Sequence, residues 1–288
     1  TAHALFHSIH FHHAFTMGDN QAGWAYALKR VSMEESCPMA LRRERTREYI
    51  VVLNNLIMMQ MHLKKYDDAL ITIRKLENVP AKSREASAIR FFLGLVNETH
   101  LYSVTGDFEK GIQRIRQAET HLSYYRNLAN KRRYVLICYN AAYLCFGAGQ
   151  YPDAIKWLNH IIHWPKETET MEDLYCHSQI LNLIFHFEMG NDRLLESAVK
   201  SAYRYLYKRE RLYGFENTIL NFIRKDSANL LLPGMRKQTF EKLRGELIQL
   251  SHDPQEKKAL QYFDFISWLE SKIENRPFAE IVREKART

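Results

Sequence analysis

Four asparagines recur along the chain at nearly constant intervals, and their side chains could bind a peptide backbone. Asn55, Asn97, Asn140 and Asn182 are separated by 42, 43 and 42 residues. An amide side chain donates and accepts hydrogen bonds at once, as binding to a peptide group requires. Because asparagine is a poor residue for the middle of a helix, its recurrence there indicates a role for the amide. The four amides could instead bond carbonyl groups of neighbouring helices, or reflect shared ancestry of the repeats.

Two arginines, a histidine and a tyrosine accompany these asparagines. Arg90 and Arg133 each precede an asparagine by seven residues, about two helical turns. Guanidinium groups bind carboxylates with two parallel hydrogen bonds, so these arginines could pair with acidic residues or the C-terminal carboxylate of a ligand. His100 and Tyr143 follow by three residues and share the helix face. Seven residues before Asn55 the chain has Glu48 and not an arginine, so the row of basic residues beside the asparagines is short. Alternatively, the arginines are solvated first-turn residues and the tyrosine packs between helices.

Other patterns with chemical potential are sparse. His3, His7 and His10 follow one another at intervals of four and three residues, and two histidines one turn apart can share a transition metal. We favour the alternative that these residues belong to the first helix of a hairpin, whose apolar residues form its core. The chain contains no Gly-rich phosphate loop and no GxSxG, HExxH or CxxC motif. We therefore predict no enzymatic activity, no bound metal and no cofactor.

The elements that carry these residues follow from a repeat of about 42 residues. Five turns are separated by 46, 42, 43 and 41 residues, at Gly18, Lys64, Gly106, Gly149 and Gly190. Apolar residues recur at spacings of three and four on both sides of each turn, which predicts a helix, a tight turn and a second helix. Glycine at the turn can adopt the left-handed conformation that ends the first helix.

These units resemble the tetratricopeptide (TPR) repeat. Residues 65–69, Lys-Tyr-Asp-Asp-Ala, and 150–154, Gln-Tyr-Pro-Asp-Ala, match the second half of that motif. The longer period is similar to that of the kinesin light chains, and the resemblance covers roughly residues 3–206. It implies an all-α fold, a right-handed α-α superhelix, with the asparagines on or beside its concave wall. Asparagines at that wall bind peptides in several TPR families.

The chain departs from the repeat after residue 206. We predict five TPR-like hairpins in 1–206 and, in 207–288, a degenerate sixth hairpin formed by helices over 215–232 and 235–250. A single helix over 254–273 would then cap the stack, because the last repeat of a solenoid otherwise exposes its core. Residues 262–273 are similar to the C-terminal end of an uncharacterised group of bacterial TPR-like proteins. We expect the two parts to form one continuous domain.

Composition excludes several classes of protein. The chain is 46% hydrophobic and has 11 glycines and 7 prolines, whereas average usage would give about 20 and about 14. Disordered and linker-rich classes are therefore excluded. No run of about 18 residues is apolar and uncharged, so we expect no membrane span. Four cysteines without a paired spacing favour a reducing compartment, and the start of the chain lacks a signal-peptide pattern, so we predict a cytoplasmic location.

The charge pattern bears on the partner. A net charge of +8 permits an acidic partner without requiring one. Basic residues occur in small groups mixed with acidic ones, which is typical of solvated helix faces and disfavours nucleic acid as the partner.

We predict a non-catalytic scaffold or adaptor that binds a protein or peptide segment along a concave face. Two alternatives stay open: a nucleic-acid-binding helical repeat, and the sensing or regulatory half of a larger protein whose effector domain precedes Thr1. A homodimer formed through apolar residues of the first helix is a further expectation.

Overall fold

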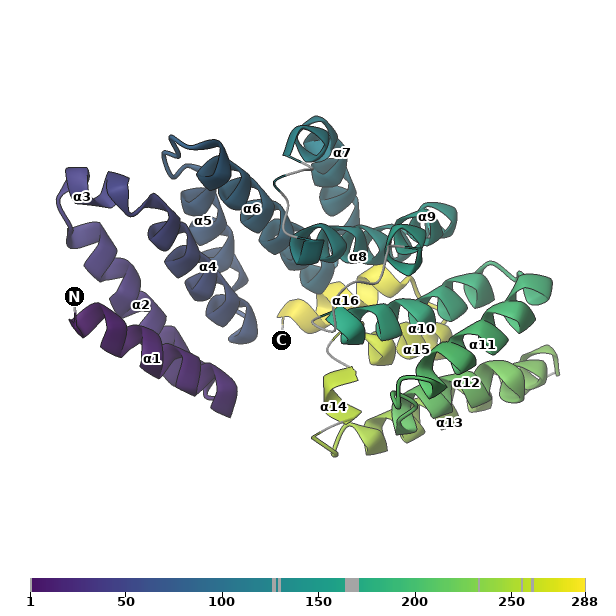
Figure 1. Ribbon diagram of the computed structural model, residues 1–288. Helices are drawn as coiled ribbons and strands as arrows, with labels where there is room; N and C mark the ends of the chain where they lie inside the picture. The colour runs from purple at the N-terminus through teal and green to yellow at the C-terminus, as the bar shows by residue number, and fades with distance from the viewer. Residues whose placement is uncertain are drawn as a thin grey trace. The chain divides into compact units, whose positions relative to one another are not determined.

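The protein is built of α-helices (Figure 1). The computed structural model describes residues 2–125, 128, 131–163, 171–232, 234–254, 256–259 and 262–287. Within those residues no strand occurs, which confirms the all-α prediction. None of the helices in these ranges is both long enough and apolar enough to cross a membrane.

Five pairs of helices flank the five predicted turns. They are α1 (Ala2–Met17) with α2 (Asn20–Ser36), α4 (Thr46–His62) with α5 (Tyr66–Glu77), α6 (Arg84–Thr105) with α7 (Phe108–Tyr125), α8 (Lys131–Gly147) with α9 (Tyr151–Ile162), and α10 (Glu172–Glu188) with α11 (Asp192–Tyr207). The helix–turn–helix prediction is confirmed at each turn. A short helix, α3 (Met39–Glu44), lies between the first two pairs and accounts for the longer first interval between turns.

The five turns share one backbone geometry. Gly18, Gly106, Gly149 and Gly190 have φ angles between 65° and 74°, and Lys64 has a φ of 55°. Beyond four of these turn residues, the next N–H donates to a carbonyl oxygen five residues earlier, at 2.8–3.1 Å. This bond satisfies a carbonyl at the helix end, as in the Schellman motif. Lysine adopts this conformation at an energetic cost that glycine avoids.

The chain divides into two compact units, and unit 1 holds residues 1–105 and 110–140. Helix α2 packs against α1 and α4, and α5 packs against α4 and α6. Their core includes the fully buried side chains of Leu53, Ile57 and Ile73. Gly23 lets α2 approach α4 closely, because a Cβ atom at this position would lie 2.6 Å from Sδ of Met59.

A buried carboxylate joins three helices of unit 1. Glu98 on α6 is 1% exposed and binds Arg74 of α5 at 2.5 Å and Arg114 of α7 at 2.6 Å. Arg114 also binds Glu77, at 2.9 Å. Since a buried charge is tolerated only when it is paired, this network fixes α5, α6 and α7 to one another.

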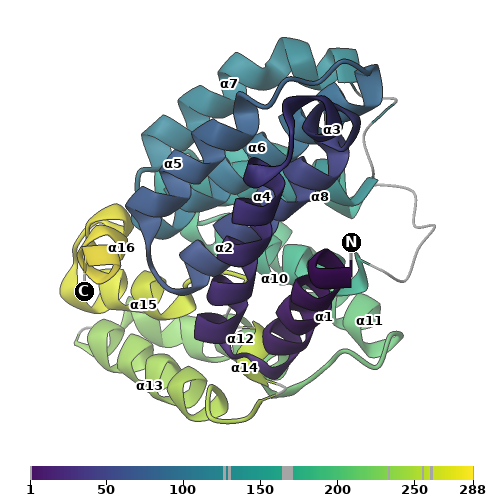
Figure 2. The same cartoon turned by 90° about the vertical axis from the view of Figure 1, so that its left-hand side faces the viewer.

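Unit 2 holds residues 106–109 and 141–288. Its later elements are α12 (Gly214–Arg224), the 3-10 helix η3 (Asp226–Leu231), α13 (Met235–Leu250), α14 (Glu256–Ala259), α15 (Phe265–Glu274) and α16 (Phe278–Arg287). Helix α13 packs against η3 and α15, and α15 packs against α16 (Figure 2). Trp268 of α15 is buried, and its Nε1 donates to Glu188 of α10 at 2.7 Å.

Two helix predictions in unit 2 were wrong. The helix predicted over 254–273 is divided into α14 and α15, because the side chain of Asp264 accepts the N–H of Ser267 and begins a new helix there. The helix predicted over 215–232 ends at Arg224 and is followed by η3. A hydrogen bond from the hydroxyl of Ser227 to the carbonyl of Ile223 accompanies this change.

Candidate functional site

Asparagine amides join successive first helices of the hairpins in unit 1. Nδ2 of Asn97 on α6 donates to Oδ1 of Asn54 on α4 at 2.8 Å. Nδ2 of Asn140 on α8 donates to Oγ1 of Thr99 on α6 at 3.0 Å and to a backbone carbonyl oxygen of α6 at 3.1 Å. These donors are engaged between helices, as the structural alternative for the asparagines expects. Peptide binding by the amides stays a prediction.

The hydrogen-bonded column runs through Asn54 rather than Asn55. Asn54, Asn97 and Asn140 are separated by 43 and 43 residues, and we call these three residues the amide column. Asn55 is half-buried, and its side chain has no hydrogen bond to another described residue. Asn182 lies in unit 2, where its Oδ1 is buried without a hydrogen-bond partner in the described part of the chain. Positions 54 and 55 both hold asparagine. Only Asn54 precedes Asn97 by 43 residues, the interval that also separates Asn97 from Asn140, and this equality is the sequence signal that selects Asn54.

The same interval of 43 residues defines a column of arginines. Arg47, Arg90 and Arg133 each lie seven residues before a member of the amide column, near the starts of α4, α6 and α8. We call these three residues the arginine column. Counting from Asn55 places Glu48 in this column instead, which is why the sequence prediction missed Arg47.

Two members of the arginine column have no acidic partner among the residues that the structure describes. Burial and the charge of nearby Arg47 lower the pKa of Arg133. No described carboxylate lies within ion-pair distance of Arg47 or Arg133. Arg90 instead donates from Nη1 to the carbonyl oxygen of Val79 at 2.6 Å, which ties α6 to the end of α5. Two guanidinium groups whose charges affect each other, and which have no counter-ion among the described residues, form a favourable position for a carboxylate.

The other two predicted site residues have different surroundings. The side chain of His100 on α6 is exposed, yet desolvation by the surrounding atoms and, to a lesser extent, the charge of His62 on α4 lower its pKa to about 4. Tyr143 is buried in unit 2, where its hydroxyl accepts the N–H of Asp264 at 3.3 Å and its ring centroid lies 4.8 Å from that of Phe263. Burial and the charge of Asp264 raise the pKa of Tyr143. This tyrosine therefore packs between helices, the alternative given for it above.

Three of the N-terminal histidines, His3, His7 and His10, lie on α1. Among the described residues, no group of three or more His, Cys, Asp or Glu side chains could hold a metal ion. His10 instead stacks on the ring of Tyr26, with centroids 5.2 Å apart. Helix α1 also exposes large apolar side chains, namely those of Leu5, Phe6, Ile9, Phe15 and Met17. Dimer formation through this face stays a prediction.

Similarity to known proteins assigns no role to the amide and arginine columns. The TPR resemblance rests on the turn motifs given above. No model of a known protein family matches the sequence, and a comparison with curated proteins finds no relative.

Proposed function

We propose that the chain is a non-catalytic, TPR-like scaffold or adaptor that binds a protein or peptide segment through its carboxylates. The observation that carries the proposal is the column of arginines at the repeat interval, of which Arg47 and Arg133 have no acidic partner among the described residues. A carboxylate that accepts hydrogen bonds from both would relieve their repulsion. Either an acidic side chain or a C-terminal carboxylate has this chemistry.

The amide column connects the helices that carry the arginine column. The hydrogen bonds of Asn97 and Asn140 connect α4, α6 and α8. Seven residues separate the two columns, or about 10 Å along a helix. Because the helices are connected at the amide column, the arginines need little rearrangement to receive a ligand, and preorganisation of this kind strengthens binding.

The exposed side chain of His100 gives the ligand a direction. It lies on α6 ten residues after Arg90, about 15 Å along the helix, which four or five residues of an extended chain could span. In this proposal the carboxylate binds the arginine column and the preceding residues extend toward His100. The hairpins would continue into the right-handed superhelix that the resemblance implies, and this face would be its concave wall.

A random peptide library tests the proposal. The full chain is used to select peptides with free C-termini, and the selected sequences are compared with those selected by the double variant Arg47→Gln/Arg133→Gln. We expect wild-type protein to enrich Asp, Glu or a required free C-terminus, and the variant to lose that enrichment. Far-ultraviolet circular dichroism and melting of both proteins verify that the variant is folded.

The matched control is Lys82→Gln/Arg116→Gln, which removes two exposed charges of unit 1 outside the column. This variant should select the same peptides as wild-type protein. Selection of acidic peptides that is unchanged by the column substitutions, or lost equally with the control, would contradict the proposal.

A further inference from the structure

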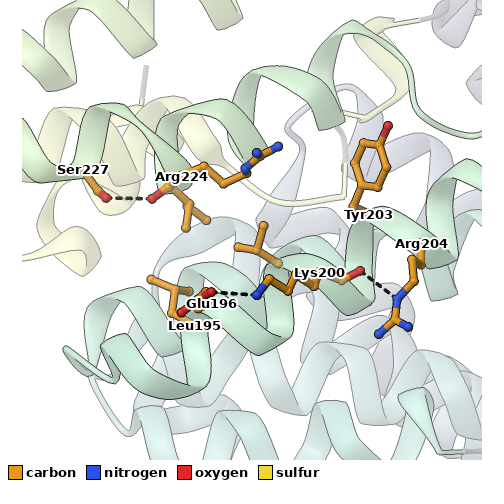
Figure 3. A pocket seen from close by; sticks show the side chains of 9 residues that line it. Leu195, Glu196, Lys200, Tyr203, Arg204, Arg224 and Ser227 are labelled. Carbon is orange, nitrogen blue, oxygen red and sulfur yellow. Dashed lines mark hydrogen bonds and ion pairs between the residues drawn. The ribbon is translucent and has the colours of Figure 1, made fainter.

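A groove in unit 2 lies between α11 and the end of α12, apart from the residues that carry the proposed function (Figure 3). Its volume is about 790 Å³, within the range of about 300–1,000 Å³ typical of ligand sites. One face of α11 supplies six of its lining residues, which recur at helical spacing: Leu195, Glu196, Val199, Lys200, Tyr203 and Arg204. Ile223, Arg224 and Ser227 line the facing side. From 195 to 204 the groove follows α11 for about 13 Å, or two and a half turns.

The charge of the groove is positive. Lys200, Arg204 and Arg224 line it together with a single acid, Glu196. Nζ of Lys200 binds this acid at 2.7 Å, and a dashed line marks this ion pair in Figure 3. Arg204 donates only to a carbonyl of its own helix, and Arg224 on the facing helix has no acidic partner in the described part of the chain. Two exposed guanidinium groups therefore remain for a ligand on opposite sides of the groove.

The apolar surface of the groove is formed by three aliphatic side chains and one tyrosine. Leu195, Val199 and Ile223 are each no more than 7% exposed and close the floor. Tyr203 is 40% exposed and lies parallel to Tyr207, which is 66% exposed, with ring centroids 5.9 Å apart. Exposed tyrosine beside arginine is typical of the residues that dominate protein–protein interfaces.

We propose that this groove docks an acidic amphipathic helix of a protein partner. Lys200 and Arg204 are one helical turn apart, so two carboxylates one turn apart on a docked helix would match them. One carboxylate would bind Arg204, and the other would bind Lys200 in place of Glu196. Arg224 meets the other side of the docked helix, and the ring of Tyr203 covers an apolar residue of its face. This arrangement is the helix-in-groove mode of recognition.

The same features argue against the two other classes of anionic ligand. A single-stranded nucleic acid needs a continuous basic track and open ring faces for base stacking, whereas Glu196 interrupts the basic residues and the two tyrosine rings stack on each other. The N–H groups of a helix N-terminus are a favourable site for a small phosphate ligand. Here Arg224 is the last residue of α12, so the groove meets the opposite end of that helix.

Fluorescence anisotropy with a defined probe tests the proposal on the full chain. The probe is a labelled 16-residue helix with leucines along one face and glutamates on both sides of it. We expect Arg204→Glu/Arg224→Glu to weaken its binding at least tenfold at low salt. Glu196→Gln releases Lys200 and should strengthen binding two- to threefold. Lysines in place of the glutamates should abolish binding to wild-type protein and restore it to the charge-reversed variant.

A control variant separates the groove from the general charge of unit 2. Arg193→Glu/Arg236→Glu makes the same change of charge at exposed positions outside the groove and should alter the affinity less than twofold. Equal losses in the two double variants would overturn the proposal. It would also be overturned if a 12-residue oligothymidylate or inorganic pyrophosphate bound the groove more tightly than the acidic helix. Because the substitutions of the arginine column lie in unit 1, the two proposals can fail separately.

Discussion

Asparagine and arginine share one repeat in unit 1, yet their surroundings give them different roles. The amides of Asn97 and Asn140 are engaged in hydrogen bonds between helices, whereas Arg47 and Arg133 face no acid among the described residues. A satisfied buried polar group stabilises the fold, and an unneutralised pair of like charges does not. In the proposal, the amide column therefore supports the fold and the arginine column binds the ligand.

Replacement of Asn97 measures how much the amide column contributes to the stability of the fold. Asn97→Ala leaves Oδ1 of Asn54 without its donor and should lower the free energy of unfolding by about 1–2 kcal/mol in urea titrations. Asn55→Ala is the matched control on α4, because Asn55 has no such bond, and it should leave that free energy unchanged within about 0.5 kcal/mol. Equal losses in the two variants would show that the hydrogen bond contributes nothing.

Glu216 should make stability depend on pH. Burial and the charge of Glu256 raise the pKa of Glu216 to about 7 from its ordinary 4.5, against the opposing effect of backbone N–H donors. The folded state therefore holds this proton more tightly than the unfolded state. Stability is gained by protonation at low pH and is lost as pH rises from about 5 through 7, by about 2–3 kcal/mol for this group.

The variant Glu216→Gln isolates that effect. Glutamine keeps an oxygen that can accept the N–H of Tyr213 but does not titrate. The difference in unfolding free energy between the two proteins should grow in favour of the variant as pH rises from 5 to 7.5. A difference that does not change with pH would show that Glu216 titrates alike in both states.

At the scale of the element, turns were predicted well and helix interruptions were not. Glycine spacing identified four of the five turns within the helix pairs, because the left-handed conformation of these turns favours glycine. The division between α14 and α15 depends on one aspartate, and Asp264 resembles many exposed aspartates in the sequence. The asparagine register was missed by one residue because adjacent asparagines satisfy the helical pattern equally.

The turn at Lys64 provides a test of backbone strain. Lys64→Gly should raise the free energy of unfolding by about 1 kcal/mol, since lysine occupies a left-handed conformation there with a φ of 55°. Gly149→Ala is the reverse change, because a Cβ atom at Gly149 would meet nothing within 4 Å and the cost is that of the backbone alone. It should lower stability by about 1 kcal/mol in thermal melts. A loss of stability in Lys64→Gly would contradict this assignment.

A substitution in the buried ion-pair network of α5, α6 and α7 should change stability more than the turn substitutions do. Glu98→Gln leaves Arg74 and Arg114 without the carboxylate between them and should destabilise the protein by about 3 kcal/mol in urea titrations. The control is Glu241→Gln, which breaks an exposed pair with Lys237 at 3.8 Å and should cost less than about 0.5 kcal/mol. Similar losses in both variants would show that burial adds nothing to this network.

At the scale of the whole molecule, each compact unit carries its own positive candidate surface. The arginine column lies in unit 1 and the tyrosine-lined groove in unit 2. The net charge of +8 permits an acidic partner but does not say where it would bind. The groove was not predicted from the sequence because it depends on how α12 ends beside α11. The arginine column, by contrast, can be predicted from the sequence, because its three members are separated by the same interval of 43 residues.

Melting with and without an acidic peptide tests the central claim most directly. The peptide is a hexapeptide of alternating Ala and Asp with a free C-terminus, added to wild-type protein and to Arg47→Gln/Arg133→Gln. Without peptide, the variant should melt no lower than wild-type protein, because it removes a repulsion. At ten times the dissociation constant, the peptide should stabilise wild-type protein by about 1.4 kcal/mol and leave the variant unchanged. A variant that melts lower than wild-type protein, and is stabilised by the peptide to the same extent, would contradict a carboxylate site at the arginine column.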